Sequence, residues 1–392
     1  MADLGGGELK FDGYARTGRR AGTRNHVLLL PLSGHFDAVV DEVASRVTGV
    51  VAARVHDALD GGIGEFERQV LAGFATNPNV GEVLLVSLTA SPLDVLLEEM
   101  IKAAGVPVRH HSLSGVGALG LLVDVLAQSA SDAVGRCSSQ RRVAVDVSAL
   151  IVATECGGSD GLSGLTANPL LGRVVDRLVA AGATAVLGEV PELIGAEHLL
   201  ASHSSSAAAG GHLLELTQRW ESIAIGLGVD LRGAQPSPGN QAGGLTTIEE
   251  KSLGAICKVG KSPLTEVVAY GASPTRSGVV VMDTPGHDVE QLTGVAAGGA
   301  QIVVFTTGRG TPTGSPIVPT IKLSTNSAIA RQLVGTIDFD ASRALDEGME
   351  PLADELLAVL LAVASGQRTV AEEARQWDFA LPPMVVGGGP RV

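Results

Sequence analysis

The stretch GVVVMDTPGH, residues 278–287, joins a β-branched run directly to a turn that carries Asp, Thr, Pro, Gly and His. A run of this kind, bounded by turn residues, is typical of a buried strand. The same order of strand and polar or Gly-rich loop recurs at ATAVLGEV (183–190), QIVVFTTGRG (301–310) and TIKLSTNS (320–327). Ligands of open α/β sheets bind beyond the carboxyl ends of the strands, so we expect these loops to converge on one site.

Strand-like and helix-like segments alternate along most of the chain, which predicts an α/β fold. In the first part we expect four strands, at residues 26–34, 49–55, 82–90 and 106–113. A stretch of small polar residues (127–142) then breaks the pattern, and we place a boundary near Ser139. A second set follows, with a strand over 143–158 and a packing helix over 349–366. The sequence thus predicts two α/β domains with mainly parallel sheets, residues 1–139 and a catalytic domain of residues 140–392, with active-site loops at the C-terminal ends of the strands.

Composition narrows the classes of function. Of 392 residues, 45% are hydrophobic but only 3% aromatic, and 51 are glycine, which predicts cores of Ala, Val and Leu. The net charge of −14 argues against a broad nucleic-acid-binding surface. No apolar run approaches the ~20 residues that span a bilayer, so we expect no membrane insertion. Three scattered cysteines do not make a disulfide framework, and together with the absence of an export signal they favour the cytoplasm.

Two short motifs suggest a GTPase, and their surroundings argue against it. AICKVGKS (255–262) fits a phosphate-binding loop and MDTPGH (282–287) fits a GTPase switch. A phosphate-binding loop needs a strand before it and a helix directly after it. Here the preceding residues look helical, and Pro263 follows the motif. We therefore interpret the match as a coincidence.

The stretch GGSDG (157–161) fits the nucleophile elbow of serine hydrolases. That elbow requires strand, serine and helix in immediate succession, whereas the sequence here predicts a long loop with a helix that begins only near Asn168. A serine hydrolase based on Ser159 remains a weak alternative.

The stretch GYARTGRRAGTRNH (13–26) concentrates four arginines just before a buried strand. Guanidinium groups pair in bidentate fashion with carboxylates, so an anionic substrate is one use for them. A solvated basic turn is the other interpretation. We take Arg16, Arg20, Arg24 and Asn25 as candidate substrate-binding residues.

Further polar groups follow the strands of the second half among glycines and threonines, in a pattern that suits a small polyhydroxylated anion. The candidates for substrate binding are Ser159, Asp160, Asn240, Asp283, Thr307, Arg309, Lys322 and Asn326.

Adjacent acidic and basic groups at TTIEEK (246–251) could transfer protons. Helix capping by Thr with Glu in the first turn explains the acidic residues nearly as well. Lys251 gains nothing from a helix N-terminus, which favours a functional role for it. We expect proton transfer to involve Lys251, His287 and Glu250.

Taken in order, GYARTGRRAGTRNH, CGGSDGLSGLTANP, GEVPELIGAEHLL, PSPGNQAGGLTTIEEKSLG, MDTPGHD and FTTGRGTPTGSPIVPTIKLSTN resemble the altronate/galactarate dehydratase family from about residue 13 to about 345. The resemblance implies a lyase that removes water from a sugar acid to give a 2-keto-3-deoxy acid. It also implies a divalent metal, Fe(II) or Mn(II), for which the expected ligands are Cys156, Glu189 and His26. The large subunit of sulfolactate sulfo-lyase, which expels sulfite, is similar too.

Two departures from the family pattern bear on the substrate. Dehydratases usually show His-x-x-Gly-Cys and Gly-Cys-Glu where this sequence has HDALD (56–60) and SLTAS (87–91). The chain also begins almost directly at the arginine stretch, which implies that a separate small subunit supplies the SAF domain. We further expect a homo-oligomer.

From these residues we expect β-elimination on a small anionic hydroxy acid. Arginines would hold its carboxylate, a base would take the α-proton, and a metal or an acid would assist departure of the C3 substituent. The alternatives are a sulfo-lyase subunit and a family member that retains the fold without catalysis.

Overall fold

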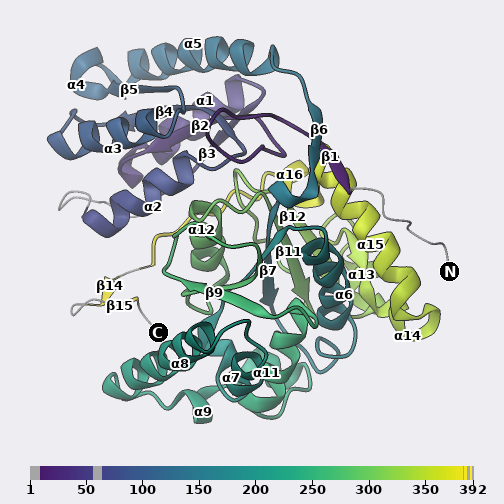
Figure 1. Cartoon of the computed structure of the whole chain (residues 1–392). Helices are drawn as coiled ribbons and strands as arrows, with labels where there is room; N and C mark the ends of the chain where they lie inside the picture. Colours follow the sequence, from purple (N-terminus) through teal and green to yellow (C-terminus); the bar gives the residue numbers. More distant parts are fainter. Residues whose placement is uncertain (1–8, 56–63, 383, 386–388, 391–392) are drawn as a thin grey trace.

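A computed structural model of the chain describes residues 9–55, 64–382, 384–385 and 389–390. It contains a four-stranded and a seven-stranded sheet, both parallel, with helices around them (Figure 1). The predicted fold class is confirmed: two parallel α/β layers follow one another along the chain.

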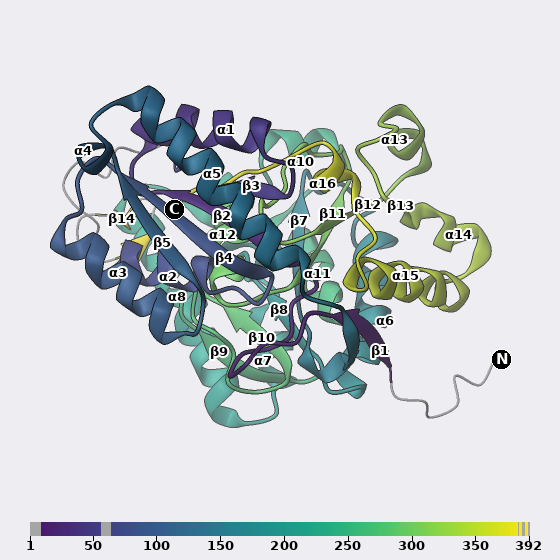
Figure 2. The ribbon, with the colours of Figure 1, turned by 90° about the horizontal axis from the view of Figure 1, so that it is seen from above.

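The four predicted strands of the first half form one parallel sheet. Its order is β3 (Val50–Ala52), β2 (His26–Pro31), β4 (Val80–Ser87) and β5 (Val108–Ser112). Helices α1 (Asp37–Arg46) and α5 (Leu119–Ser138) cover one face, and α2 (Glu65–Ala75) and α3 (Pro92–Ala103) cover the other (Figure 2). Because both faces are covered, the central strands read as continuous apolar runs.

The seven-stranded sheet holds the second half together. Its order is β13 (Phe339–Asp340), β12 (Thr320–Ser324), β11 (Ile302–Thr307), β7 (Ile151–Gly157), β8 (Thr184–Leu187), β10 (Gly278–Met282) and β9 (Leu264–Val268). After β7 the chain passes to β8 on one side, and β11 lies on the other side. Such a reversal of strand order opens a crevice at the carboxyl ends of the strands.

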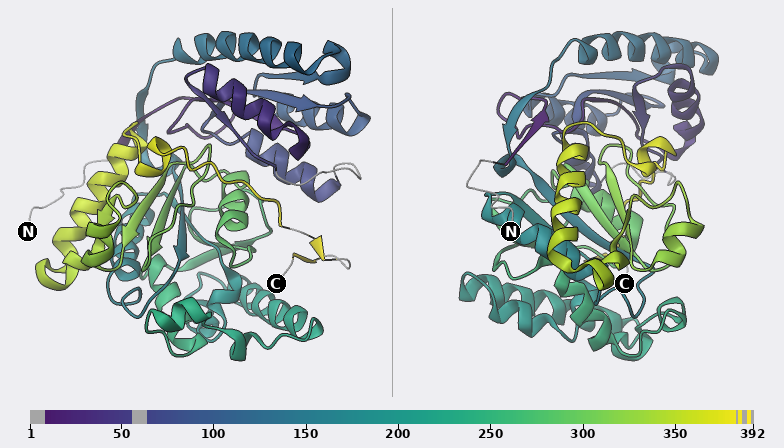
Figure 3. Two further views of the ribbon diagram at one scale, coloured as in Figure 1. Left: turned by 180° about the vertical axis from the view of Figure 1, so that it is seen from behind. Right: turned by 90° about the vertical axis from the view of Figure 1, so that its right-hand side faces the viewer.

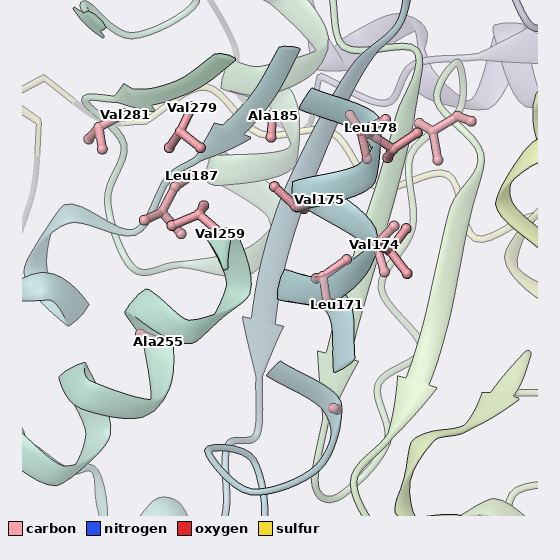
Figure 4. Packing of buried hydrophobic residues seen from close by; sticks show 14 of the residues in the cluster. Leu171, Val174, Val175, Leu178, Ala185, Leu187, Ala255, Val259, Val279 and Val281 are labelled. Atoms are coloured by element: carbon pink, nitrogen blue, oxygen red, sulfur yellow. The ribbon is translucent and has the colours of Figure 1, made fainter. Parts of the chain in front are cut away.

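Aliphatic side chains dominate the core of the second half. On α6 (Ala167–Ala180), Leu171 and Val175 pack in one cluster with Leu187 of β8 and Val279 of β10 (Figure 4). The predicted packing helix is present as α15 (Met349–Ala364), and α12 (Asp288–Ala297) also contacts the sheet. The other helices are α4 (Leu113–Val116), α7 (Glu197–Ser202), α8 (Ala207–Gly226), α9 (Leu231–Ala234), α10 (Pro238–Ala242), α11 (Ile248–Ile256), α13 (Ser327–Gln332), α14 (Ala344–Glu347) and α16 (Val370–Glu373), and the hairpin β14 (Met384–Val385) and β15 (Gly389–Pro390) lies near the end.

The strand expected over 143–158 is divided in two. The Asp146 side chain accepts a hydrogen bond from Ser148 N (2.8 Å) and caps a 3-10 turn, Val147–Ala149. The part before the turn, β6 (Val143–Asp146), leaves the large sheet and pairs antiparallel with β1 (Lys10–Gly13). A side-chain cap of this kind redirects a chain locally, and apolar periodicity does not reveal it.

The two halves of the chain also pack against each other. Phe74 of α2 meets Phe379 edge to face at 4.9 Å, and the segment after α16 runs between the halves (Figure 3). At the β1 end, Phe11 is buried in the core of the second half. The predicted boundary at Ser139 falls directly after α5, yet β1 packs with the residues beyond that boundary. In the described part of the chain, no helix has the length and apolar character to cross a membrane.

Candidate active site

Loops from four neighbouring strands meet at a cleft of about 490 Å³ at the carboxyl edge of the seven-stranded sheet. The segment between α8 and α11 closes it from the other side. The polar residues that line it are Cys156, Glu192, Gln235, Ser237, Asn240, Lys251, His287, Asp288, Glu290 and Arg309. The loops after β7, β8, β10 and β11 thus converge as the alternation of strands and loops indicated, whereas the loop after β12 does not line this cleft.

Lys251 reaches the cleft from α11 and is 8% exposed. Its ammonium lies 2.8 Å from Glu192 Oε1 and donates to Gln235 Oε1 (3.1 Å) and Asn240 Oδ1 (3.2 Å). Burial alone would lower the pKa of Lys251, but the Glu192 carboxylate raises it overall. The side chain is therefore a charged acid in the cleft rather than a free base.

A second lysine lies behind the cleft, fully buried. Lys258 Nζ lies 2.5 Å from Glu189 Oε2, and neither side chain is more than 1% exposed. Next to this pair, both carboxyl oxygens of Glu155 are buried, and neither has a hydrogen-bond partner in the part of the chain that the structure describes. Burial and the neighbouring Glu189 raise the pKa of Glu155 well above its ordinary value, because a second negative charge there is unfavourable.

Cys156 ends up between these two lysines at the end of β7. Its Sγ lies 2.6 Å from Ser159 Oγ, and the side chain is 4% exposed at the floor of the cleft. Burial raises the pKa of the Cys156 thiol, while the positive charge of Lys258 opposes that change. At neutral pH the group is a protonated thiol.

A second cavity, of about 400 Å³, shares Cys156, Glu192 and Lys251 with the first. Asp160 and Ser159 lie in its wall. Asp160 is tied to neighbouring loops, since Oδ2 accepts from Thr325 Oγ1 (2.8 Å) and lies 3.5 Å from Asn326 Nδ2. Thr307 Oγ1 accepts from Gly310 N (2.9 Å) close by. These groups hold the loops in place.

His287 and Asp288 follow β10, where the predicted turn leads into α12. The His287 side chain is 68% exposed, and its Nδ1 lies 3.9 Å from Glu290 Oε1. Asp288 lies deeper, and burial together with Glu192 raises the pKa of its carboxyl group. The turn therefore brings an accessible imidazole and a half-buried carboxyl group to one wall of the cleft.

Arg309 is an arginine of the cleft without a counter-charge. Its guanidinium makes no hydrogen bond or ion pair among the residues that the structure describes, and it lies beside Gly239. A side chain at Gly239 would collide with this guanidinium. The group is therefore free to bind an anion inside the cleft.

Three other candidate residues make contacts that stabilise the fold. Glu250 Oε2 accepts from Thr246 N (2.7 Å) and Thr246 Oγ1 (2.5 Å) at the start of α11, which is the capping arrangement that we considered as an alternative. Asp283 accepts from Trp220 Nε1 (2.9 Å) and pairs with Arg219 at 2.5 Å. Lys322 is buried, donates to Thr311 O (2.7 Å) and contacts Gln376, and burial lowers its pKa to about 8.

The arginine stretch lies elsewhere, and this corrects our expectation for it. Arg24 pairs with Glu372 at 2.7 Å, and Arg16 donates to Asn25 Oδ1 (2.8 Å) and Pro78 O (3.0 Å). Arg20 donates to Ser148 O (3.2 Å), just before β7 begins. The stretch leads into β2 and so lies at the amino ends of the four-stranded sheet, and Arg20 also reaches the amino end of β7, the end of that strand opposite the cleft.

The expected metal ligands are not brought together. His26 begins β2 at the far edge, beside Glu372 and Arg24, whereas Cys156 and Glu189 lie at the cleft. Within the described residues, no three His, Cys, Asp or Glu side chains are arranged to hold a metal ion. Beside Glu189 the Lys258 ammonium already supplies the positive charge. These residues do not fit a metal ion, so Fe(II) or Mn(II) stays a prediction. The stretch HDALD (56–60) lies outside the described residues.

Several residues of the cleft were missed at the level of sequence. Glu192 and Asp288 belong to loops that were singled out, but the pattern did not distinguish them from helix-initiating acids. Lys258 lies in a stretch that we examined only as a phosphate loop. Its signal is a lysine among apolar neighbours, which requires a buried counter-charge.

Two family models match the chain. Residues 13–134 match the second domain of D-galactarate dehydratase/altronate hydrolase, and residues 147–386 match the C-terminal domain of D-galactarate/altronate dehydratase. The chain belongs to the D-galactarate/altronate dehydratase family.

Named relatives fall into two activities. The (2R)-sulfolactate sulfo-lyase subunit beta of Chromohalobacter salexigens is 35% identical over 95% of this chain and 98% of its own length. The altronate dehydratase of Bacillus subtilis is 33% identical over 91% of this chain and 74% of its own length. The galactarate dehydratase (L-threo-forming) of Escherichia coli is 35% identical over 79% and 61%. The family is thus one of dehydratases and related lyases, and the resemblance inferred from the motifs is confirmed.

Proposed function

We propose that the chain is a lyase that removes water from a sugar acid such as altronate or galactarate and gives a 2-keto-3-deoxy acid. The observation that carries the proposal is the joint presence of Lys251 and Arg309 in one cleft, the first paired with Glu192 and the second without a counter-charge. A hydroxy-acid anion needs one cation to bind it and another to stabilise the charge that develops during elimination.

Arg309 is the proposed ligand of the substrate carboxylate. Its guanidinium lies against the backbone of Gly158 and Gly239, so a carboxylate can approach its outer donors and accept two parallel hydrogen bonds. Ser159, Asp160 and Asn240 line the same or the adjoining cavity and are proposed to contact the hydroxyl groups. This places the carboxylate near the β11 loop and the hydroxylated chain toward α10.

His287 is the proposed base. It would take the proton at C2, and the electron pair of that bond would form the C2–C3 double bond as the C3 hydroxyl group leaves. The Lys251 ammonium would stabilise the negative charge that develops on the leaving oxygen and donate a proton to it, so that the oxygen departs as water. The resulting enol then becomes the 2-keto acid.

A second candidate is elimination of sulfite from sulfolactate. The alignment with the sulfo-lyase subunit covers 98% of that relative, which favours it over the other relatives in extent. The same groups would serve, with a C–S bond in place of the C–O bond. Because that relative is a subunit, we also propose a small SAF-domain partner and a homo-oligomer of this chain, to be checked by co-purification and light scattering.

The deciding experiment is a substrate panel of aldonates, aldarates and sulfolactate, assayed for keto-acid and sulfite release with Fe(II) or Mn(II) supplied and with candidate small subunits from the same genome. We expect turnover of one class. Arg309→Gln should raise KM at least tenfold for that substrate, because it removes a charge-assisted contact. Arg331→Gln is the matched control, since this arginine is exposed on α13. An unchanged KM in Arg309→Gln would contradict the assignment.

A further inference from the structure

Arg16, Arg19, Arg20 and Arg141 gather where the two halves meet, between the amino ends of β4 and β5 in the four-stranded sheet and the amino end of β7 in the seven-stranded sheet. A cavity of about 430 Å³, here called the arginine cavity, is lined by Ala15, Arg16, Thr17, Arg19, Gly81, Gly105, Pro107, Gln140 and Arg141. A neighbouring cavity of about 260 Å³ shares Arg19 and adds Arg20. The proposed lyase chemistry makes no use of either cavity.

The arginine cavity lacks negative charge. Among the described residues, no carboxylate lies within ion-pair distance of Arg16, Arg19, Arg20 or Arg141, whereas the nearby Arg24 pairs with Glu372. This is unusual in a chain with a net charge of −14. Burial, and then the positive charge of Arg19, lower the pKa of Arg16 to about 10. An anion between these groups would relieve their mutual repulsion.

Some donors of these arginines have no hydrogen-bond partner among the described residues. Arg16 donates its hydrogen bonds to neutral oxygens, among them Pro78 O and Gln140 Oε1 (3.2 Å). Arg19 uses Nη1 for Thr76 O (3.1 Å), but its Nε is buried without a partner among the described residues, a costly state for a charged group. Arg141 is exposed at the rim, and no partner of its guanidinium exists in the described part of the chain.

We propose that the arginine cavity binds a small oxyanion of the phosphate or sulfate class, held between Arg19 and Arg141. A tetrahedral oxyanion carries about two negative charges and can accept bidentate hydrogen bonds from more than one guanidinium.

The arginine cavity is separate from the candidate active site. Ile151, at the start of β7, lines the neighbouring cavity that contains Arg19, whereas Cys156 and Gly157, at its end, line the cleft. The length of β7 puts them about 20 Å apart. An anion bound here would contact segments of the first half and the segment that joins it to the second.

The experiment measures phosphate binding to the full chain. Inorganic phosphate and, in a second arm, sulfate are titrated against sodium chloride of equal ionic strength, with Tm and calorimetric heat as readouts. We expect a saturable rise in Tm of about 2–5 °C for the wild type. Both anions also stabilise proteins non-specifically, so the comparison between variants decides the outcome. Arg141→Gln, at an exposed position, should weaken binding at least tenfold, and Arg19→Lys should weaken it as well.

Two controls keep the result specific. Arg331→Gln removes an exposed arginine elsewhere and should leave the titration unchanged. Arg309→Gln removes the free guanidinium of the cleft and should also leave it unchanged. The proposal is overturned if the wild type gives no saturable response beyond chloride, if Arg141→Gln binds phosphate as the wild type does, or if Arg309→Gln alone abolishes binding. The last result would move the anion to the active site.

Discussion

The two edges of the seven-stranded sheet carry their positive charges differently. At the carboxyl edge, Lys251 and Lys258 each face a glutamate at 2.8 and 2.5 Å, respectively. At the amino edge, Arg20 donates to Ser148 O, and Arg16, beside the adjoining four-stranded sheet, donates to Pro78 O; neither pairs with a carboxylate among the described residues. Paired buried charges fix a local geometry, whereas unpaired ones leave room for a ligand. The density of arginines in a sequence is therefore a poor guide to where substrate binds.

The largest expected effect comes from breaking the buried pair. Lys258→Met leaves Glu189 beside Glu155 without a cation, and we expect a loss of about 3–5 kcal/mol in the free energy of unfolding. Urea denaturation measures it. Adding Glu189→Gln to the first change should recover part of the loss, since no uncompensated charge remains. Arg20→Gln, at the amino edge, should cost at most about 1.5 kcal/mol. Equal losses in the two single variants would erase the contrast between the edges.

The next largest effect is on activity, which should fall in a variant of the carboxyl edge but not in a variant of the amino edge. Lys251→Met removes the acid of the cleft, and kcat/KM for the accepted substrate should fall about 10²–10³-fold, equivalent to about 3–4 kcal/mol. Arg20→Gln should stay within about threefold of the wild type. Steady-state keto-acid formation provides the measurement. A fall in kcat/KM of similar size in Arg20→Gln would indicate that the arginine stretch belongs to the substrate site.

The pH dependence of stability tests the region where the arginine stretch enters the four-stranded sheet, since His26 begins β2. Burial lowers the pKa of His26 from its ordinary value of 6.5 to about 4, with Glu372 opposing and Arg24 adding to the shift. Between these values the unfolded chain binds more protons than the folded one, so stability falls as the pH falls from about 6.5 toward 4. His26→Asn should remove about 1–3 kcal/mol of that loss. Denaturation curves at several pH values give the slope, and an unchanged slope would contradict the burial of this imidazole.

The smallest effect concerns a residue beside the cleft. Glu250→Ala removes a helix cap and should cost about 0.5–1.5 kcal/mol in unfolding free energy, with kcat within about threefold of the wild type. Thermal denaturation and the keto-acid assay check the two parts. A kcat loss above a hundredfold would restore Glu250 as a proton-transfer residue.

Sequence alone predicted the parts of the fold that depend on simple periodicity. The strands at 26–34, 82–90 and 301–310 are present because buried parallel strands require continuous apolar runs. The turn after β10 and the loop of Arg309 meet at one cleft because the carboxyl ends of parallel strands share an edge.

Pairings between residues that lie far apart in the chain could not be predicted from the sequence. Whether Lys251 faces Glu192 or solvent depends on how α11 packs against the loop after β8, and no local pattern carries that information. The position of Arg16–Arg24 was open to prediction, because the stretch precedes a parallel strand and such segments lie at its amino end. We assigned the arginines to substrate binding because of their chemistry and did not use that topological signal.

The short ribbon of β1 and β6 has a consequence for how the chain comes apart. Because β1 belongs to the second half, the chain passes between the halves twice, through residues 14–25 and again through residues 139–142. A single protease cut in either connection would leave the other intact. A cut within residues 14–25 frees only the β1 peptide, because residues 26–392 stay one covalent chain. After a cut within residues 139–142, only the pairing and packing of β1 hold the two fragments together, so the first half separates once the second half unfolds.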